Sequence, residues 1–187
     1  MKKIIYLIIL FNFLFNFNVN ASIKKKIITN FENTQNLSFE FKQHINDQIE
    51  TGNCIIEYPR KIYCEYNNLN KKLLVSNGKS LVIKNQKSNQ YYIYPIKKTA
   101  LNLILDKDFL LQKMNSAEGN LIGEKYYRFK FLENDNEINI FFDKNSFNIT
   151  GWQNTDIYQN LVITYLFNIE RNKKIKKNQF KLPKKNE

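Results

Sequence analysis

The chain has 187 residues, a formal net charge of +12, two cysteines and a single histidine. Its residues show no catalytic triad, no phosphate-binding loop and no zinc-ligand spacing. We therefore expect no enzyme and no metal or other cofactor. The lysines are spread along the chain and most aromatic residues alternate with them, which disfavours a nucleic-acid-binding module with aromatics on a basic face.

The N-terminus has the three-part pattern of a secretory signal peptide. Lys2 and Lys3 precede an apolar run over 4–15, and Val19-Asn20-Ala21 precedes Ser22 as a cleavage site. A membrane anchor is the alternative, but a span needs roughly 20 apolar residues and asparagines interrupt this run. We predict cleavage of 1–21 and a mature single domain over 22–187. No cysteine lies at the cleavage point for a lipid anchor, and export across a membrane to an oxidising compartment would permit disulfides.

The first mature segments are a predicted helix and a predicted strand. The stretch 22–37 places Ile23, Ile27, Ile28 and Phe31 at helical spacing, with lysines on the other side. The stretch 37–45 then alternates as a strand, with Leu37, Phe39, Phe41 and Ile45 on one face and Glu40, Lys42 and His44 on the other.

The two cysteines lie in a predicted β-hairpin, "GNCIIEYPRKIYCEYNN" (52–68). If the turn is centred on Pro59 with an odd number of loop residues, the cysteines lie opposite each other on the dry face. Directly opposed residues are close enough for a disulfide, although two buried free thiols would also fit. The predicted pairs are Cys54 with Cys64, Ile56 with Ile62, Glu57 with Lys61 and Ile55 with Tyr63.

The remaining segments predict an antiparallel meander interrupted by a helical insert. A second hairpin spans 72–85 around Asn77-Gly78, and the very apolar stretch 98–114 predicts helical turns. Alternating strands follow at 124–133, 137–144 and 161–170. Two short helices are a thin cover for the dry face of such a sheet. Either the sheet curls into a self-packed barrel, or it leaves a hydrophobic hollow that something else fills.

The ordered set of motifs resembles the LolA family, the periplasmic carriers of outer-membrane lipoproteins. The resemblance covers nearly all of the mature chain and rests on "LSFEFKQ" (37–43), the cysteine hairpin, "KLLVSNGKSLVIKN" (72–85), "YYIYPIKKTALNLIL" (91–105), the stretch 149–172 and "FKLPK" (180–184), the expected final strand. It implies a mainly β fold, in which a curved antiparallel sheet forms an incomplete, half-open β-barrel covered by short α-helices.

The resemblance also implies a function, partners and site residues. A monomeric carrier would shield the acyl chains of its lipoprotein cargo in a cavity. An inner-membrane ABC-type lipoprotein-releasing complex would load it, and an outer-membrane lipoprotein receptor would unload it. The family's arginine before the hairpin proline is replaced by Tyr58, so Tyr58 and Arg60 are the expected lid contacts. The expected cavity residues are Phe39, Phe41, Ile56, Ile62, Leu101, Leu105, Tyr127, Phe129 and Ile140.

Two further points stay open in the sequence. Another periplasmic lipid-binding, lipopolysaccharide-binding or sensor protein with the same half-barrel is the alternative function, whereas the receptor for the same cargo would carry a lipid-anchored cysteine. The basic C-terminal tail, "RNKKIKKNQFKLPKKNE" (171–187), is either a solvated segment or a contact for an acidic partner or a membrane surface.

Overall fold

The computed structural model describes residues 22–187, except 70, 89, 134–135, 156–159 and 186–187. The predicted signal peptide over 1–21 therefore lies outside the described residues. The described part of the chain begins with a helix over 22–32 and continues into eleven strands. These are β1 (Asn36–Ile45), β2 (Gln48–Glu57), β3 (Lys61–Tyr66), β4 (Lys72–Asn77), β5 (Ser80–Asn85), β6 (Gln90–Pro95), β7 (Gly119–Ile122), β8 (Tyr126–Glu133), β9 (Asn136–Asp143), β10 (Ile149–Thr155) and β11 (Leu161–Arg171).

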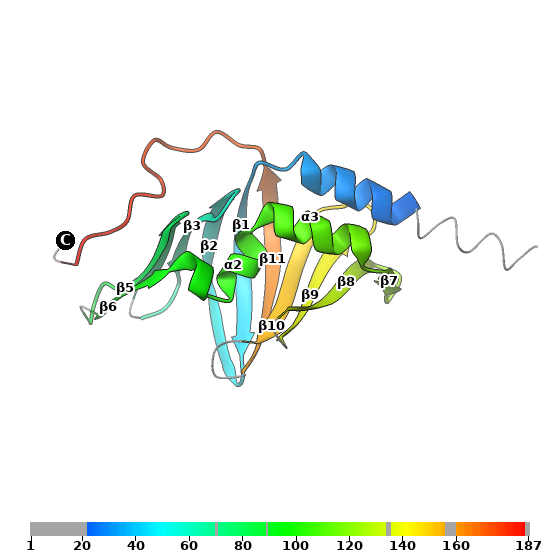
Figure 1. Ribbon diagram of the computed structural model, residues 1–187. Helices are drawn as coiled ribbons and strands as arrows, with labels where there is room; N and C mark the ends of the chain where they lie inside the picture. The colour runs from blue at the N-terminus through cyan, green and yellow to red at the C-terminus, as the bar shows by residue number, and fades with distance from the viewer. Residues whose placement is uncertain (1–21, 70, 89, 134–135, 156–159, 186–187) are drawn as a thin grey trace, which may run out of the picture.

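All eleven strands form one antiparallel sheet in the order β6-β5-β4-β3-β2-β1-β11-β10-β9-β8-β7. The first and last strands of the chain pair with each other at the centre, so two sequential meanders are joined side by side. The sheet is strongly curved (Figure 1). Its two edge strands, β6 and β7, do not pair with each other, so the barrel is not closed. This confirms the predicted fold class, a curved antiparallel sheet that forms an incomplete barrel.

A helical insert between β6 and β7 covers the concave face of the sheet (Figure 1). It consists of η1 (Ile96–Lys98), α2 (Leu101–Leu105) and α3 (Lys107–Ser116). The chain is extended at Asp106, whose carboxylate accepts a hydrogen bond from the backbone N–H of Phe109 and caps α3. The sequence predicted helical turns over 98–114, and Leu105, Leu110 and Met114 of these helices are fully buried.

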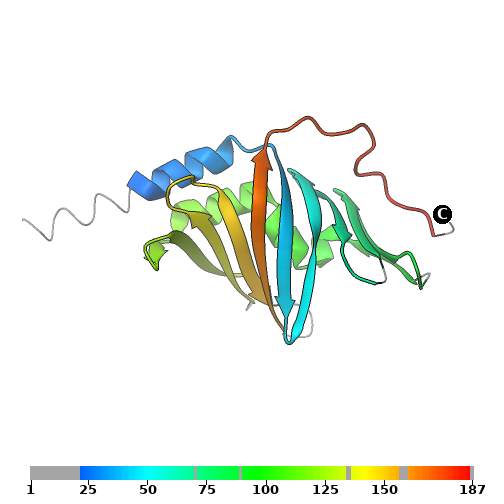
Figure 2. The same ribbon diagram turned by 180° about the vertical axis from the view of Figure 1, so that it is seen from behind.

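The N-terminal helix (22–32) packs beside the insert at one end of the sheet (Figures 1 and 2). Its predicted apolar side is correct, because Ile27, Ile28 and Phe31 are buried. The Nζ atom of Lys24 lies 2.8 Å from the carbonyl oxygens of both Asn115 and Ala117, at the end of α3. The N-terminal helix and α3 are thereby held together.

The expected final strand over 180–184 is wrong. The described part of the tail, 172–185, has no strand, and it contacts the outer face of the sheet, which points away from the insert. Near its end the segment is held by a side chain of β6: the Tyr91 hydroxyl donates to the carbonyl oxygen of Pro183 at 3.2 Å. Phe180 is buried against this face, with the Nζ of Lys61 5.8 Å from the centroid of its ring, so the segment lies across the sheet and not along its edge.

Candidate binding site: a cavity under the helical insert

A cavity of about 210 Å³ lies between α2 and the concave face of the sheet. Its walls come from both meanders, because β1 and β11 pair at the centre of the sheet. Most of the lining is apolar: Phe39, Phe41, Ile45, Cys54, Ile62, Cys64, Tyr66, Leu74, Leu81, Ala100, Leu101, Ile104, Trp152 and Val162. The polar lining residues are Gln43, Asn154 and Thr164. Such a lining suits an apolar ligand with a polar end.

The predicted cavity residues fall into two groups. Phe39, Phe41, Ile62 and Leu101 line the cavity. The other five do not line it and are buried in the core: Ile56, Leu105, Tyr127, Phe129 and Ile140. The hydrophobic hollow and the self-packed core therefore both exist. The hollow lies under α2, where β1, β2, β3, β10 and β11 supply most of its wall.

Sequence reasoning missed several lining residues. Leu74 is the Cα partner of Cys64, and Trp152 is the partner of Thr164 on the central strand β11. The turn at Asn77-Gly78 predicts that Leu74 lies opposite Ile83, whereas only the pairing of β3 with β4 places Leu74 beside Cys64. No local signal identifies Trp152, because its place depends on the pairing of β10 with β11.

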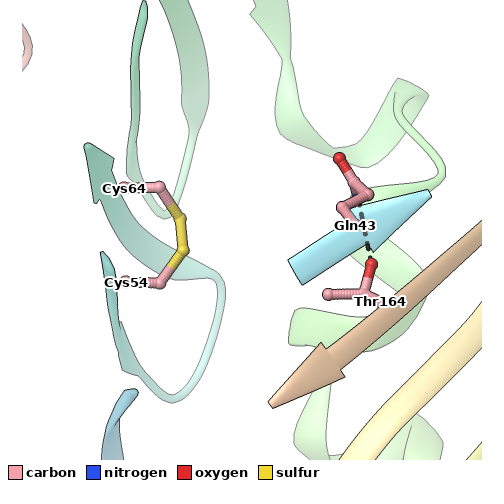
Figure 3. The surroundings of a disulfide bond; sticks show 4 residues. All are labelled: Gln43, Cys54, Cys64 and Thr164. Carbon is pink, nitrogen blue, oxygen red and sulfur yellow. Dashed lines mark hydrogen bonds between the residues drawn. A yellow bond between two sulfur atoms is a disulfide. The ribbon is translucent and has the colours of Figure 1, made fainter. Parts of the chain in front are cut away.

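The cysteine hairpin has the predicted register. Cys54 pairs with Cys64, Ile55 with Tyr63, Ile56 with Ile62 and Glu57 with Lys61, around a three-residue loop. The two cysteines form a disulfide, with a Cα–Cα distance of 4.2 Å, and both line the cavity. Figure 3 shows this bond on the β2–β3 side and Gln43 with Thr164 on the other. The bond therefore joins two strands of the cavity wall.

Arg60, in the hairpin loop, contacts the helical insert at three points. Its backbone N–H donates to the carbonyl oxygen of Leu105 at 3.0 Å. Its Nε donates to Oδ1 of Asn102 at 3.1 Å, and its guanidinium forms an ion pair with Asp106. The Arg60 and Asp106 side chains are 29% and 17% exposed, so the pair is largely shielded from water. Arg60 thus ties the hairpin to α2 and to the junction between α2 and α3.

Tyr58 contacts a different helix. Its ring packs edge-on against Phe31 of the N-terminal helix, with ring centroids 5.5 Å apart. Its hydroxyl is buried and has no hydrogen-bond partner among the described residues. Burial raises the pKa of Tyr58 well above its usual value, so the phenol stays neutral. Of the two expected lid contacts, Arg60 is the one that forms polar contacts with the insert.

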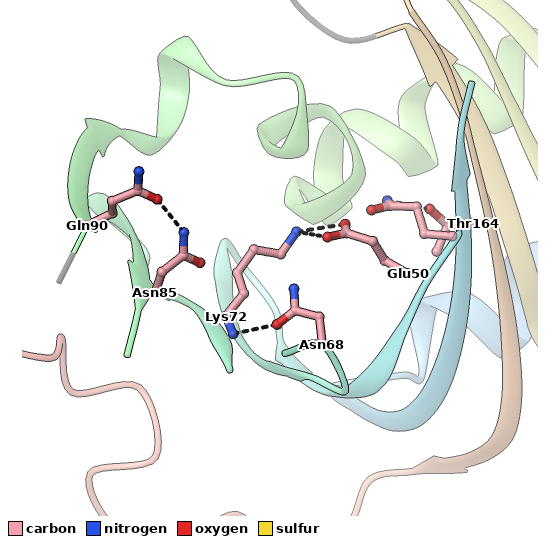
Figure 4. Close-up of polar contacts among 7 residues, drawn as sticks. Glu50, Asn68, Lys72, Asn85, Gln90 and Thr164 are labelled. Atoms are coloured by element: carbon pink, nitrogen blue, oxygen red, sulfur yellow. Dashed lines mark hydrogen bonds and ion pairs between the residues drawn. The ribbon is translucent and has the colours of Figure 1, made fainter. Parts of the chain in front are cut away.

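A band of polar side chains crosses the concave face at the polar end of the cavity (Figure 4). The Nζ atom of Lys72 lies 2.5 and 2.6 Å from the two carboxylate oxygens of Glu50 and 3.8 Å from the centroid of the Tyr66 ring. On the other side, Gln43 donates to the Thr164 hydroxyl at 2.9 Å. The concave face therefore changes from apolar under α2 to polar at this end.

No group of three or more His, Cys, Asp and Glu side chains could hold a metal ion within the described residues. The one histidine, His44, lies on the outer face with its ring 5.8 Å from that of Tyr165.

None of the helices in the described ranges has the length and apolar character required to cross a membrane.

Comparisons with solved structures give distant similarities. A LolA superfamily protein from Nitrosomonas europaea is 7% identical, with a TM-score of 0.44 over 87% of this chain and 97% of that one. A putative outer-membrane lipoprotein-sorting protein domain from Vibrio parahaemolyticus is 5% identical, with a TM-score of 0.47 over 87% and 96%. The MucA/MucB complex of Pseudomonas aeruginosa contains a chain that is 11% identical, with a TM-score of 0.48 over 89% and 59%.

The family comparison is more informative than these pairwise similarities. Compared by sequence with curated proteins, the chain has no significant match. The family described as "Outer membrane lipoprotein carrier protein LolA" matches residues 32–183, which include β1 to β11, the insert and most of the tail. Membership implies a periplasmic protein with a lipid-binding or lipoprotein-binding role. The chain belongs to the LolA family of outer-membrane lipoprotein carrier proteins.

Proposed function

We propose that this protein shields the acyl chains of lipoproteins and carries them through the periplasm from the inner to the outer membrane. The observation that carries the proposal is the apolar cavity between α2 and the sheet, with a polar end at Gln43, Asn154 and Thr164. An acylated lipoprotein has the same polarity, because its hydrocarbon chains lead to ester, amide and peptide groups.

Opening the insert would enlarge the cavity for such chains. The contacts of α2 with the rest of the protein include those from Arg60, whereas α3 is tied to the N-terminal helix through the bonds of Lys24 to Asn115 and of Lys107 to Glu32. The extended residue Asp106 separates the two helices. We infer that α2 is the part of the insert that moves when cargo enters, and that Arg60 holds it closed in the absence of cargo.

Tight binding of the acyl chains would prevent cargo from being released into water at a useful rate. Burial contributes about 0.8 kcal/mol per CH₂, so a chain with about 15 such groups contributes on the order of 12 kcal/mol. Release into water would be very slow. Direct transfer between apolar cavities avoids this barrier, which supports an inner-membrane ABC-type releasing complex and an outer-membrane lipoprotein receptor as partners. We expect a monomeric carrier in both exchanges.

The disulfide has a structural role in this proposal. The resemblance to the LolA family implies bulky aromatic residues at two hairpin positions where this chain has Cys54 and Cys64. Both cysteines line the cavity. A covalent cross-link between β2 and β3 would keep this wall in place when α2 moves away. The cross-link also leaves more room for cargo than two aromatic rings would.

The test is to purify the mature protein from a periplasm and to identify bound lipoprotein by native and lipid mass spectrometry. Leu101→Asp would place a charge on the α2 wall of the cavity, and Leu132→Asp is a matched control because Leu132 is 64% exposed. We expect co-purified acylated lipoprotein with the parent and the control, and little with Leu101→Asp.

An apo protein that also fails to take up labelled lipoprotein from inner-membrane vesicles would contradict the proposal. Co-purification of a lipid other than lipoprotein would instead identify a different lipid carrier with the same fold.

A further inference from the structure

The C-terminal tail carries a dense strip of positive charge. Residues 172–185 have seven lysines and no aspartate or glutamate. We call this segment the lysine strip. Its lysines are Lys173, Lys174, Lys176, Lys177, Lys181, Lys184 and Lys185.

The lysine strip is fixed to the folded domain by contacts near its C-terminal end. Phe180 is only 9% exposed, and the Nζ of Lys61 lies 5.8 Å from the centroid of its ring. The carbonyl oxygen of Pro183 accepts a hydrogen bond from the Tyr91 hydroxyl at 3.2 Å, and that of Lys184 accepts one from Lys84 at 2.8 Å. The strip leaves the end of β11 and runs toward β5 and β6 (Figures 1 and 2).

The apolar and the charged side chains of the lysine strip lie on different sides of it. Its apolar side chains face the domain, because Phe180 is buried and Ile175 and Leu182 are half-buried. All seven lysines are exposed. The fold therefore presents the charges of the strip to the solvent and leaves no large exposed apolar side chain among them.

We propose that the lysine strip binds the anionic surface of a membrane. Each lysine near an anionic lipid surface contributes about a factor of five to binding, so several lysines act together. A diffuse layer of lipid head groups makes no demand on geometry, which suits the flexible point charges of lysine.

Two other acidic partners fit the strip less well. Protein interfaces depend on aromatic and arginine residues in buried contacts, and the strip exposes neither. Single-stranded nucleic acid needs aromatic rings for base stacking, whereas Phe180 is buried against the domain. The proposal does not depend on the cargo of the cavity, because the strip and the cavity lie on opposite sides of the sheet.

The test is co-sedimentation of the full mature protein with vesicles that contain no lipoprotein. One set consists of phosphatidylcholine and the other of phosphatidylcholine mixed with phosphatidylglycerol. The test variant carries Lys176→Gln, Lys177→Gln, Lys181→Gln and Lys185→Gln. The control variant carries four substitutions of exposed lysines elsewhere, with the same change in net charge: Lys25→Gln, Lys87→Gln, Lys97→Gln and Lys98→Gln.

We expect the parent and the control to bind only the phosphatidylglycerol vesicles, and the test variant to bind them at least tenfold more weakly. Binding of the parent should also disappear between about 0.1 M and about 1 M salt, because the screening length falls from about 10 Å to about 3 Å. No binding by the parent, or equal binding by the test and control variants, would overturn the proposal. Neither result would bear on acyl-chain binding, which is measured separately.

Discussion

Arg60→Ala is the sharpest perturbation of the cavity cover that the structure offers. The substitution removes the Nε contact with Asn102 and the ion pair with Asp106, and keeps the backbone hydrogen bond to Leu105. A hydrogen bond to a charged group contributes about 1.5–3 kcal/mol, and the partial exposure of both partners argues for the lower part of that range. We expect α2 to be held about 2 kcal/mol less tightly.

The assay is native-state hydrogen exchange followed by mass spectrometry. A loss of about 2 kcal/mol corresponds to roughly thirtyfold faster opening of α2, since each 1.4 kcal/mol is a factor of ten. The exchange of α3 should change much less, because Lys24 and Lys107 tie it to the N-terminal helix. The matched control is Arg128→Ala, which removes one exposed hydrogen bond to Asn120.

The hydrogen-exchange pattern can refute this reasoning in two ways. Equal acceleration of α2, α3 and the central strands would mean that Arg60 stabilises the whole fold and not the cover of the cavity. Unchanged exchange of α2 would mean that the apolar contacts of α2 alone hold the insert closed.

Three further predictions concern the scaffold. The intact mass should rise by two hydrogens on reduction, and loss of the Cys54–Cys64 bond should lower the free energy of unfolding by about 2–3 kcal/mol, measured by urea denaturation. Gly52→Ala should destabilise the protein by about 1–3 kcal/mol in the same assay, because a Cβ atom would lie 2.1 Å from a backbone carbonyl oxygen of β3. A hydrogen bond from the backbone N–H of Ser146 lowers the pKa of the Asp143 carboxyl. The charged carboxylate therefore stabilises the fold above its unfolded-state pKa of about 3.8, and this stabilisation is lost as the pH falls through the lower folded-state pKa. Asp143→Asn should remove this part of the pH dependence of the urea midpoint.

Control substitutions accompany the glycine and aspartate predictions, and one result would contradict the disulfide prediction. Gly123→Ala has open space around the new Cβ, so it should cost only the strain of a positive φ of 54°, about 1–2 kcal/mol. Asp47→Asn alters an exposed carboxylate and should leave the acid dependence intact. An unchanged mass after reduction would show that the two thiols are free.

The sequence by itself determined the local parts of the fold. In the cysteine hairpin, the odd loop around Pro59 and the alternation of apolar residues determine which residues face each other, and the observed pairs are the predicted ones. Helical spacing likewise identified the apolar side of the N-terminal helix, where Ile27 is fully buried. These features depend on neighbours within one or two elements, so a periodic pattern is enough to predict them.

Only the tertiary structure decided how these parts combine into a site. Ile62 and Ile56 lie on the same face of one hairpin, yet Ile62 lines the cavity and Ile56 is packed in the core. Arg60 holds the insert from a position after the proline, because the loop directs it toward Asp106, which is 46 residues away in the chain. The physical reason is that a cavity is the space left between elements distant in sequence, and the separation of α2 from the sheet is set by the packing of the whole domain and not by the pattern of any one segment.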